Sequence, residues 1–144
     1  MRIAVAGVTC ACLLLPRLPP LQASSLIEHD STVATRQPGP HGGGGVTTAY
    51  SFFARAPNLH LVFRKRALHR GSAIGYHRQD DDEIYYILSG TGELTLNGRR
   101  TVVGPGTAIL TRPGSSHGLQ QAGSEDLVII IAYQQSSSSA GAPR

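Results

Sequence analysis

The chain has 144 residues, 40% of them hydrophobic, which suits a single domain with one core. Only 15% are charged, whereas 17 glycines and 9 prolines favour short strands joined by turns over helices. The formal net charge of +4 is modest and no motif for binding DNA or RNA accompanies it, so we expect no nucleic-acid partner. These properties predict an all-β protein.

Residues 1–23 contain the three regions of a secretory signal peptide in order. Arg2 supplies a minimal positive charge, Ile3 to Leu15 forms the apolar stretch, and Ala23 is the small residue before the cleavage point. The apolar stretch is too short to cross a bilayer comfortably, so we expect no membrane association once it is removed. The alternative is a misplaced start codon, in which case this upstream sequence is not translated.

We predict that the mature protein begins near Ser24 and is secreted or periplasmic, because a signal peptide directs export and is then removed. N-terminal sequencing of the protein from its native host measures the cleavage point directly. Recovery of a chain with an intact Met1 from a cytoplasmic fraction would contradict the prediction.

Two segments have compositions that are typical of unfolded chain. Ser24 to Gly45 contains Pro38-Gly39-Pro40 and the run Gly42 to Gly45, and residues 134–144 are rich in Ser. Such segments bury too little apolar area to offset the entropy lost on ordering. We therefore expect a flexible, disordered linker over residues 24–45, a folded barrel over 46–133, and a disordered tail over 134–144.

The range from 46 to 133 reads as short strands separated by turns. The expected strands are Thr47 to Ala54, Leu59 to Leu68, Ala73 to Gln79, Glu83 to Leu88, Gly92 to Leu96, Arg100 to Val103, Thr107 to Thr111 and Asp126 to Tyr133. Asn97-Gly98 is typical of a type I′ hairpin turn. In the cationic run His60 to Arg70, apolar and charged residues alternate, and we interpret the charged positions as an outward, solvated face. Short strands with frequent turns predict a jelly-roll barrel.

Three polar residues on neighbouring strands share one parity. His77, Gln79 and Glu83 lie at positions i, i+2 and i+6, so on extended chain their side chains point to the same face. Imidazole, amide and carboxylate groups are ligands that borderline divalent metals accept. A further histidine, His117, follows in a tight turn that begins at Pro113. Together the four side chains predict a mononuclear metal site inside a small barrel.

This arrangement resembles the cupin family, whose first motif runs G-x5-H-x-H-x3,4-E-x6-G. Gly71, His77, Glu83 and Gly90 match that motif at its spacing. Gln79 departs from it, because the family usually has His at this position.

The second cupin motif, G-x5-P-x-G-x2-H-x3-N, aligns with Gly106, Pro113, Gly114 and His117, with one extra residue between Gly106 and Pro113. Gln121 stands where the family often has Asn. The resemblance covers roughly residues 46–133 and implies a single jelly-roll (cupin) barrel.

The resemblance also implies one divalent metal ion, with Mn, Fe, Zn and Ni as candidates, held by His77, Gln79, Glu83 and His117. A neutral amide oxygen is a weaker donor than imidazole, so Gln79 should reduce affinity for Cu, Ni or Zn more than for Mn or Fe(II). The alternative is a degenerate site in which Gln79 only forms hydrogen bonds within the barrel.

Tyr85 shares the parity of Glu83 and should point inward near the metal, whereas Tyr86 should face away. A buried phenol there is a candidate catalytic proton donor to a bound substrate, with structural packing as the alternative. We expect Asp80 to Asp82 to form a solvated turn without ligating the metal. Four arginines are candidates for binding a carboxylate at the pocket mouth, with simple solvation as the alternative: Arg64, Arg66, Arg78 and Arg112.

Two classes of function fit this interpretation. The first is a metal-dependent enzyme that acts on a small organic molecule, of the dioxygenase, isomerase, lyase or cyclase type implied by the resemblance. In such an enzyme the metal polarises a substrate oxygen or binds dioxygen at an open coordination position. The second is a non-catalytic module that binds a small ligand such as a sugar or an organic acid. Fold alone does not decide between them.

We also expect a homodimer, because small cupins often pair through a sheet. The strand Leu59 to Leu68 mixes apolar and cationic positions, a composition that suits pairing at a sheet edge.

Overall fold

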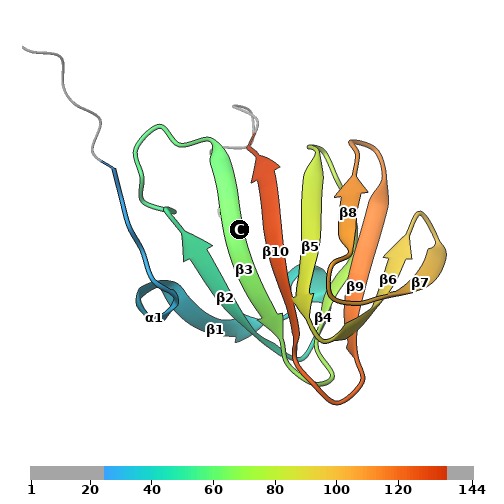
Figure 1. Ribbon diagram of the computed structural model, residues 1–144. Helices are drawn as coiled ribbons and strands as arrows, with labels where there is room; N and C mark the ends of the chain where they lie inside the picture. Colours follow the sequence, from blue (N-terminus) through green and yellow to red (C-terminus); the bar gives the residue numbers. More distant parts are fainter. Residues whose placement is uncertain (1–24, 136–144) are drawn as a thin grey trace, which may run out of the picture.

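The structure is a computed structural model that describes residues 25–135 (Figure 1). Its elements are α1 (Asp30–Val33), β1 (Ala34–Pro38), the 3-10 helix η1 (Pro40–Gly42), β2 (Val46–Phe52), β3 (Leu61–Leu68), β4 (Ala73–Arg78), β5 (Glu83–Ser89), β6 (Thr91–Leu96), β7 (Arg99–Val103), β8 (Ala108–Thr111), β9 (Ser116–Ala122) and β10 (Leu127–Gln134). The two helical segments are only four and three residues long. The prediction of an all-β protein is confirmed.

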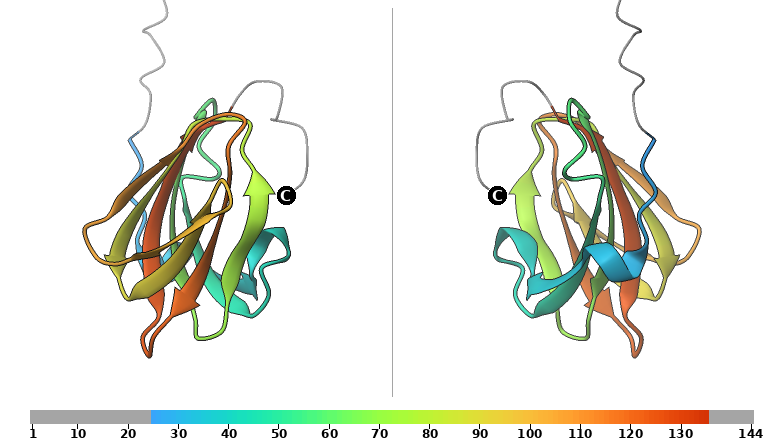
Figure 2. Two further views of the ribbon diagram at one scale, coloured as in Figure 1. Left: turned by 90° about the vertical axis from the view of Figure 1, so that its right-hand side faces the viewer. Right: turned by 90° about the vertical axis from the view of Figure 1, so that its left-hand side faces the viewer.

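The strands form two antiparallel sheets that enclose a common interior (Figures 1 and 2). One sheet has the strand order β1-β2-β3-β10-β5-β8 and the other the order β4-β9-β6-β7. From β3 onward the chain changes sheets at every connection except the β6–β7 hairpin. This is a jelly roll, so the prediction of a single jelly-roll barrel is also confirmed.

The hydrophobic core lies at the end of the barrel where β10 begins. Leu68 and Leu127 pair across β3 and β10, and both are 0% exposed. Ile87 and Ile129 are also 0% exposed and pair across β5 and β10. Full burial of such a side chain contributes about 1.5–3 kcal/mol to folding. Toward the other end of β10, polar side chains enter the interior from its neighbours, since Arg64 of β3 pairs with Ile131 and Glu83 of β5 pairs with Tyr133.

The β6–β7 hairpin turns at the position that the sequence indicates. Asn97 and Gly98 both have positive φ, 47° and 78°, as the two central residues of a type I′ turn require. By contrast, the sequence pattern does not reveal β9. This strand is held by backbone pairing with β4 on one side and β6 on the other, and the alternation of its side chains is interrupted at Gly118.

The stretch from 25 to 45 differs from the predicted flexible linker, because α1, β1 and η1 all lie within it. β1 pairs with β2 from Ala34 opposite Tyr50 to Pro38 opposite Val46, and so becomes an edge of the larger sheet. The prediction rested on side-chain composition, which indicates only how much apolar area a segment can bury. β1 is held instead by backbone hydrogen bonds to β2, and these do not depend on apolar side chains.

η1 packs directly on β4 because Gly75 carries no side chain. A Cβ atom at Gly75 would lie 2.0 Å from the carbonyl oxygen of His41, a distance that no real Cβ contact has. This close approach brings His41, from a segment outside the predicted barrel, beside the strand that carries His77.

The interpretation of β3 as a strand with outward charges is wrong at two positions. Arg64 and Arg66 line the pocket inside the barrel, Arg66 is 5% exposed, and only Lys65 among the three points outward to an ion pair with Asp30. The strand is also no sheet edge, since it lies between β2 and β10, and the edges of that sheet are β1 and β8.

The predicted signal peptide, and the predicted tail beyond residue 135, lie outside the described residues. Within residues 25–135, no helix is long and apolar enough to span a lipid bilayer.

Candidate metal centre and its pocket

The two histidines face each other across one pair of strands. In the β4–β9 ladder, His77 is the direct partner of His117, and two positions along β9 Leu119 pairs with Ile74. Three residues of β4 therefore span two residues of β9, which is a β-bulge. Ile74 and His77 would point to opposite faces of a regular strand, and the bulge lets both face the interior.

Both imidazoles are oriented through their Nδ1 atoms. Nδ1 of His77 lies 2.8 Å from the carbonyl oxygen of Gly75, and Nδ1 of His117 lies 2.7 Å from Oγ1 of Thr111. A carbonyl oxygen only accepts, so Nδ1 of His77 carries the proton and its Nε2 is an acceptor, 3.0 Å from the Gln79 amide nitrogen. This is the arrangement that presents Nε2 to a metal.

Glu83 and Gln79 complete the polar cluster from the β4–β5 side. Glu83 is 7% exposed, and its Oε2 lies 3.1 Å from Nε2 of His117. The Gln79 backbone is tied to the turn before β9, donating to the Ser115 carbonyl and accepting from the Gly114 amide at 2.8 Å each. Its side chain therefore reaches the centre of the cluster from a fixed position.

The donor set fits a divalent metal. One ligand atom each from His77, Glu83 and His117 lies within 4.8 Å of the other two, so these three residues could hold an ion. The Gln79 amide nitrogen stands 3.0 Å from Nε2 of His77, 2.6 Å from Oε2 of Glu83 and 3.1 Å from Nε2 of His117. It therefore occupies the point on which the three converge. An ion at that point requires the Gln79 side chain to draw back, and a turned amide could then offer Oε1 as a fourth ligand.

Tyr85 lies against the cluster from β5. It is 3% exposed, as its parity predicts, whereas Tyr86 is 43% exposed. Its hydroxyl lies 3.3 Å from Nε2 of His117. Burial raises the pKa of the Tyr85 phenol well above its usual value, and the Glu83 carboxylate raises it further, so the phenol stays protonated at neutral pH. A protonated phenol at this point can donate a hydrogen bond or a proton to a bound ligand.

His41 is a pocket residue that the sequence analysis does not identify. Its ring stacks on that of His77, with centroids 3.5 Å apart and planes 7° from parallel. The residue belongs to a Gly- and Pro-rich segment with no strand-like pattern, so the only sequence signal was a histidine among glycines.

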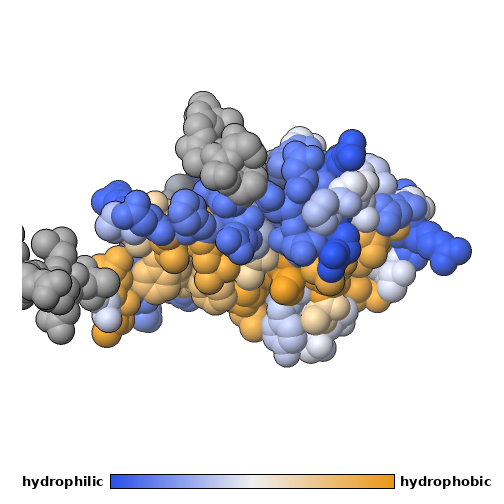
Figure 3. Space-filling view, turned by 90° about the horizontal axis from the view of Figure 1, so that it is seen from above, coloured by the Kyte–Doolittle hydropathy of each residue, from blue (hydrophilic) through white to orange (hydrophobic). Residues whose placement is uncertain are grey.

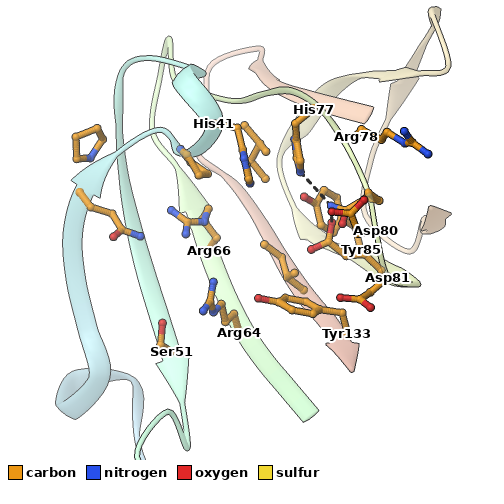
Figure 4. Close-up of a pocket in the computed structure, with 17 residues that line it drawn as sticks. His41, Ser51, Arg64, Arg66, His77, Arg78, Asp80, Asp81, Tyr85 and Tyr133 are labelled. Atoms are coloured by element: carbon orange, nitrogen blue, oxygen red, sulfur yellow. Dashed lines mark hydrogen bonds between the residues drawn. The ribbon is translucent and has the colours of Figure 1, made fainter. Parts of the chain in front are cut away.

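The candidate metal centre opens into a pocket of about 690 Å³ between the two sheets (Figure 4). Its lining residues include Arg64, Arg66, Arg78, Asp80 and Asp81 in addition to the residues already described. Asp80 and Asp81 lie in the bend between β4 and β5, where Asp80 is exposed, as expected for a solvated turn. The aspartates Asp80 and Asp81 do line the pocket, although neither belongs to the group of potential metal ligands.

The remaining positions noted in the sequence have structural roles. Arg112 pairs with Asp82 at 3.1 Å on the exposed surface and does not line the pocket. Gln121 is 6% exposed and joins two loops, because its Oε1 accepts from the Gly71 amide and its Nε2 donates to three carbonyls between 122 and 125. It contributes no atom to the metal centre.

Comparison with known proteins agrees with this geometry. A family model described as "Cupin domain" matches residues 66–133, and crystal structures of cupins share the fold. The barrel has the cupin fold. Together, these matches support membership of the cupin superfamily, and His77, Glu83 and His117 of the two motifs are the residues that converge at the candidate site.

Two similar proteins come from Thermotoga maritima. The "Oxalate-binding protein" is 34% identical over 74 residues, which cover 51% of this chain and 61% of that protein. The chain thus spans about three fifths of this relative's length. A crystal structure of a "predicted oxalate decarboxylase" is 26% identical with a TM-score of 0.70, covering 77% of this chain and all of the other.

A polyketide cyclase from Streptomyces resistomycificus is also similar, at 22% identity and a TM-score of 0.65. The match covers 78% of this chain and 81% of the cyclase. At this level of identity, the likeness concerns the fold alone.

We predict that His117→Ala abolishes tight binding of a divalent metal, because the substitution removes a ligand that β9 supplies. In the wild type, metal at about 100 times its dissociation constant should raise the free energy of unfolding by about 2.7 kcal/mol, and the variant should lose this increment. Elemental analysis measures the metal content, and denaturant unfolding with and without a chelator isolates the metal-dependent stability.

His60→Ala is the matched control, since His60 is exposed in the loop before β3. The variant Gln79→His should tighten binding of Zn or Ni relative to Mn, because imidazole is the stronger donor for the later metals. Metal content that is unchanged in both His77→Ala and His117→Ala would exclude the site.

Proposed function

We propose that this protein is a metal-dependent cupin enzyme that acts on a small organic acid. The observation that carries the proposal is the convergence of His77, Glu83 and His117 on one point at the wall of an open pocket, with Gln79 able to add an oxygen ligand. Since one of the four donors is an amide, Mn or Fe(II) suits the set better than Zn or Ni.

The chemistry divides between the bound ion and the residues around it. A divalent ion at this centre would polarise a carboxylate oxygen of the substrate. Tyr85 holds its proton beside the metal-binding atoms and is placed to donate it to an oxygen of the bound acid. The stacked His41 keeps the His77 ring in one plane and narrows the pocket on that side.

An acidic substrate is supported by two independent observations. The pocket wall contains Arg64 and Arg66, which attract an anion. Among similar proteins, one is named an oxalate-binding protein and another a predicted oxalate decarboxylase. The first of these names also supports the second candidate function, a non-catalytic module that binds an organic acid.

The enzyme would convert the bound acid into a product, whereas the binding module would release it unchanged. We predict that the Mn-loaded protein binds oxalate and that the chelated protein binds it at least tenfold more weakly, because the ion contributes directly to carboxylate binding. Calorimetry measures the affinity, and NMR of the same mixture over time measures consumption of the acid, first for oxalate and then for a panel of small organic acids. Tyr85→Phe should leave the affinity within a few-fold while lowering any turnover by about 10²-fold or more.

Metal-dependent binding without turnover of any acid in the panel would replace the enzyme with the binding module. Binding that is equal with and without metal would contradict both forms of the proposal.

We also propose a homodimer formed through the outer face of the six-stranded sheet. Exposed apolar side chains form a row across this face, since Phe63 pairs with Ala132, Ala132 with Ile84, and Ile84 with Leu110. Hydrophobic side chains gather along one side of the molecule in Figure 3. A second copy that presents the same row would remove this apolar area from water.

We predict that Ile84→Glu converts the dimer into a monomer, because each interface would then bury two carboxylates. Light scattering at micromolar concentration measures the mass. Val102→Glu is the control, since Val102 is an exposed apolar residue on β7 of the other sheet. A wild-type protein that is monomeric under these conditions would refute the dimer.

A further inference from the structure

Two arginines enter the interior of the barrel from β3 without an acidic partner. Arg64 and Arg66 share the inward parity of that strand and line the pocket. In the described part of the chain, no carboxylate lies within ion-pair distance of either guanidinium. Neither guanidinium therefore has a direct ionic partner in this part of the chain, although the carboxylates of Asp80, Asp81 and Glu83 line the same pocket.

The contacts of Arg66 are all with neutral groups. Its Nη1 donates to Oγ1 of Thr47 at 2.8 Å. With its amide oxygen turned toward the guanidinium, Gln37 accepts from Nη1 and Nη2 at 3.0 Å each. The Nε atoms of Arg64 and Arg66 are both buried, and neither has a hydrogen-bond partner within residues 25–135.

Such an arrangement is costly unless an anion completes it. Burial lowers the pKa of the Arg66 guanidinium and the nearby Arg64 lowers it further, which reflects the penalty for a buried cation beside a second cation. Planar guanidinium groups bind carboxylate and phosphate through paired hydrogen bonds, and an anion between the two arginines would offset that penalty.

The arginines and the metal centre lie on opposite walls of one pocket. Figure 4 shows Arg64 and Arg66 extending from β3 on one side, and His77 and Tyr85 on the other. The volume of about 690 Å³ is in the range of pockets for ligands much larger than a two-carbon acid. An acid bound at the metal centre therefore has room to extend toward the arginines.

We propose that Arg64 and Arg66 form an anion-binding subsite for the second anionic group of an extended organic acid. The first carboxylate of that acid lies at the metal centre, a placement that rests on the function proposed above. The second group is a carboxylate or a phosphate, which share the chemistry that guanidinium recognises. Arg64 and Arg66 of β3 then give the pocket its specificity for acids longer than oxalate.

A purely structural role accounts for one arginine only. Arg66 links β1, β2 and β3 through Gln37 and Thr47, and its replacement could disturb this end of the barrel. Arg64 has no hydrogen bond or ion pair to any of the residues that the structure describes. A structural role therefore leaves Arg64 unexplained, and Arg64 is the residue on which to test the subsite.

The test measures ligand affinity by calorimetry on the full mature chain, with Mn and with a chelator. The probes are acetate, which has one carboxylate, glutarate, which has two, and 2-phosphoglycolate, which has a phosphate as its second group. We expect the wild type to bind glutarate or 2-phosphoglycolate at least tenfold more tightly than acetate. Arg64→Gln should reduce this affinity at least tenfold and leave acetate unchanged.

Arg64→Lys should recover part of the loss, because the charge returns without the paired donors. Arg70→Gln is the matched control, since Arg70 is an exposed arginine just beyond β3 and its removal changes the net charge equally. If Arg66→Gln folds, as judged by circular dichroism, it should resemble Arg64→Gln. If it does not fold, the Arg64 variants decide the outcome.

Equal affinity of the wild type for acetate and both two-group probes would overturn the subsite. So would a loss in Arg70→Gln as large as that in Arg64→Gln. Binding of glutarate that depends on Arg64 but is unchanged by the chelator would support the subsite and would count against the proposed metal-dependent function, so the two proposals fail separately.

Discussion

The antiparallel pairing of β4 with β9 is the constraint on which the rest of the site depends. It sets His77 opposite His117 in the smaller sheet and, through the bulge after Ile74, turns His77 toward the interior. The larger sheet then supplies Glu83 and Tyr85 from β5 across the barrel. Because two sheets contribute, the metal-binding atoms converge only when the barrel is closed, and ion binding should be coupled to folding.

The hydrophobic core and the polar pocket lie toward opposite ends of the barrel. Aliphatic residues fill the end where β10 begins, and their burial offsets the cost of a polar interior at the other end. At that polar end, the amide nitrogen of Gln79 lies within hydrogen-bond distance of both histidines and of Glu83. By contrast, Arg64 of β3 has no hydrogen bond or ion pair to a described residue, and this difference supports the ligand proposed for it.

Gln79 at the candidate metal centre and the two arginines on the opposite wall line the same pocket, so a ligand that fills the pocket would meet both. If an ion binds there, an oxygen ligand from Gln79 would favour Mn or Fe(II), and the wall with Arg64 and Arg66 would favour an anion. The proposed ligand, an acid with two anionic groups, would meet both requirements at once.

Sequence alone determined the parts that depend on local periodicity and spacing. The strands from β2 to β8 and β10 follow from alternation and turn residues, and the inward parity of His77, Gln79, Glu83 and Tyr85 places them on one face. The tertiary structure alone decided the features that depend on pairing between distant segments.

β1 and β9 are strands because their backbones hydrogen-bond to neighbouring strands, and His41 reaches the site because η1 packs on Gly75. The inward direction of Arg64 and Arg66 likewise depends on which face of β3 meets the interior, and alternation identifies two faces without saying which one the fold buries.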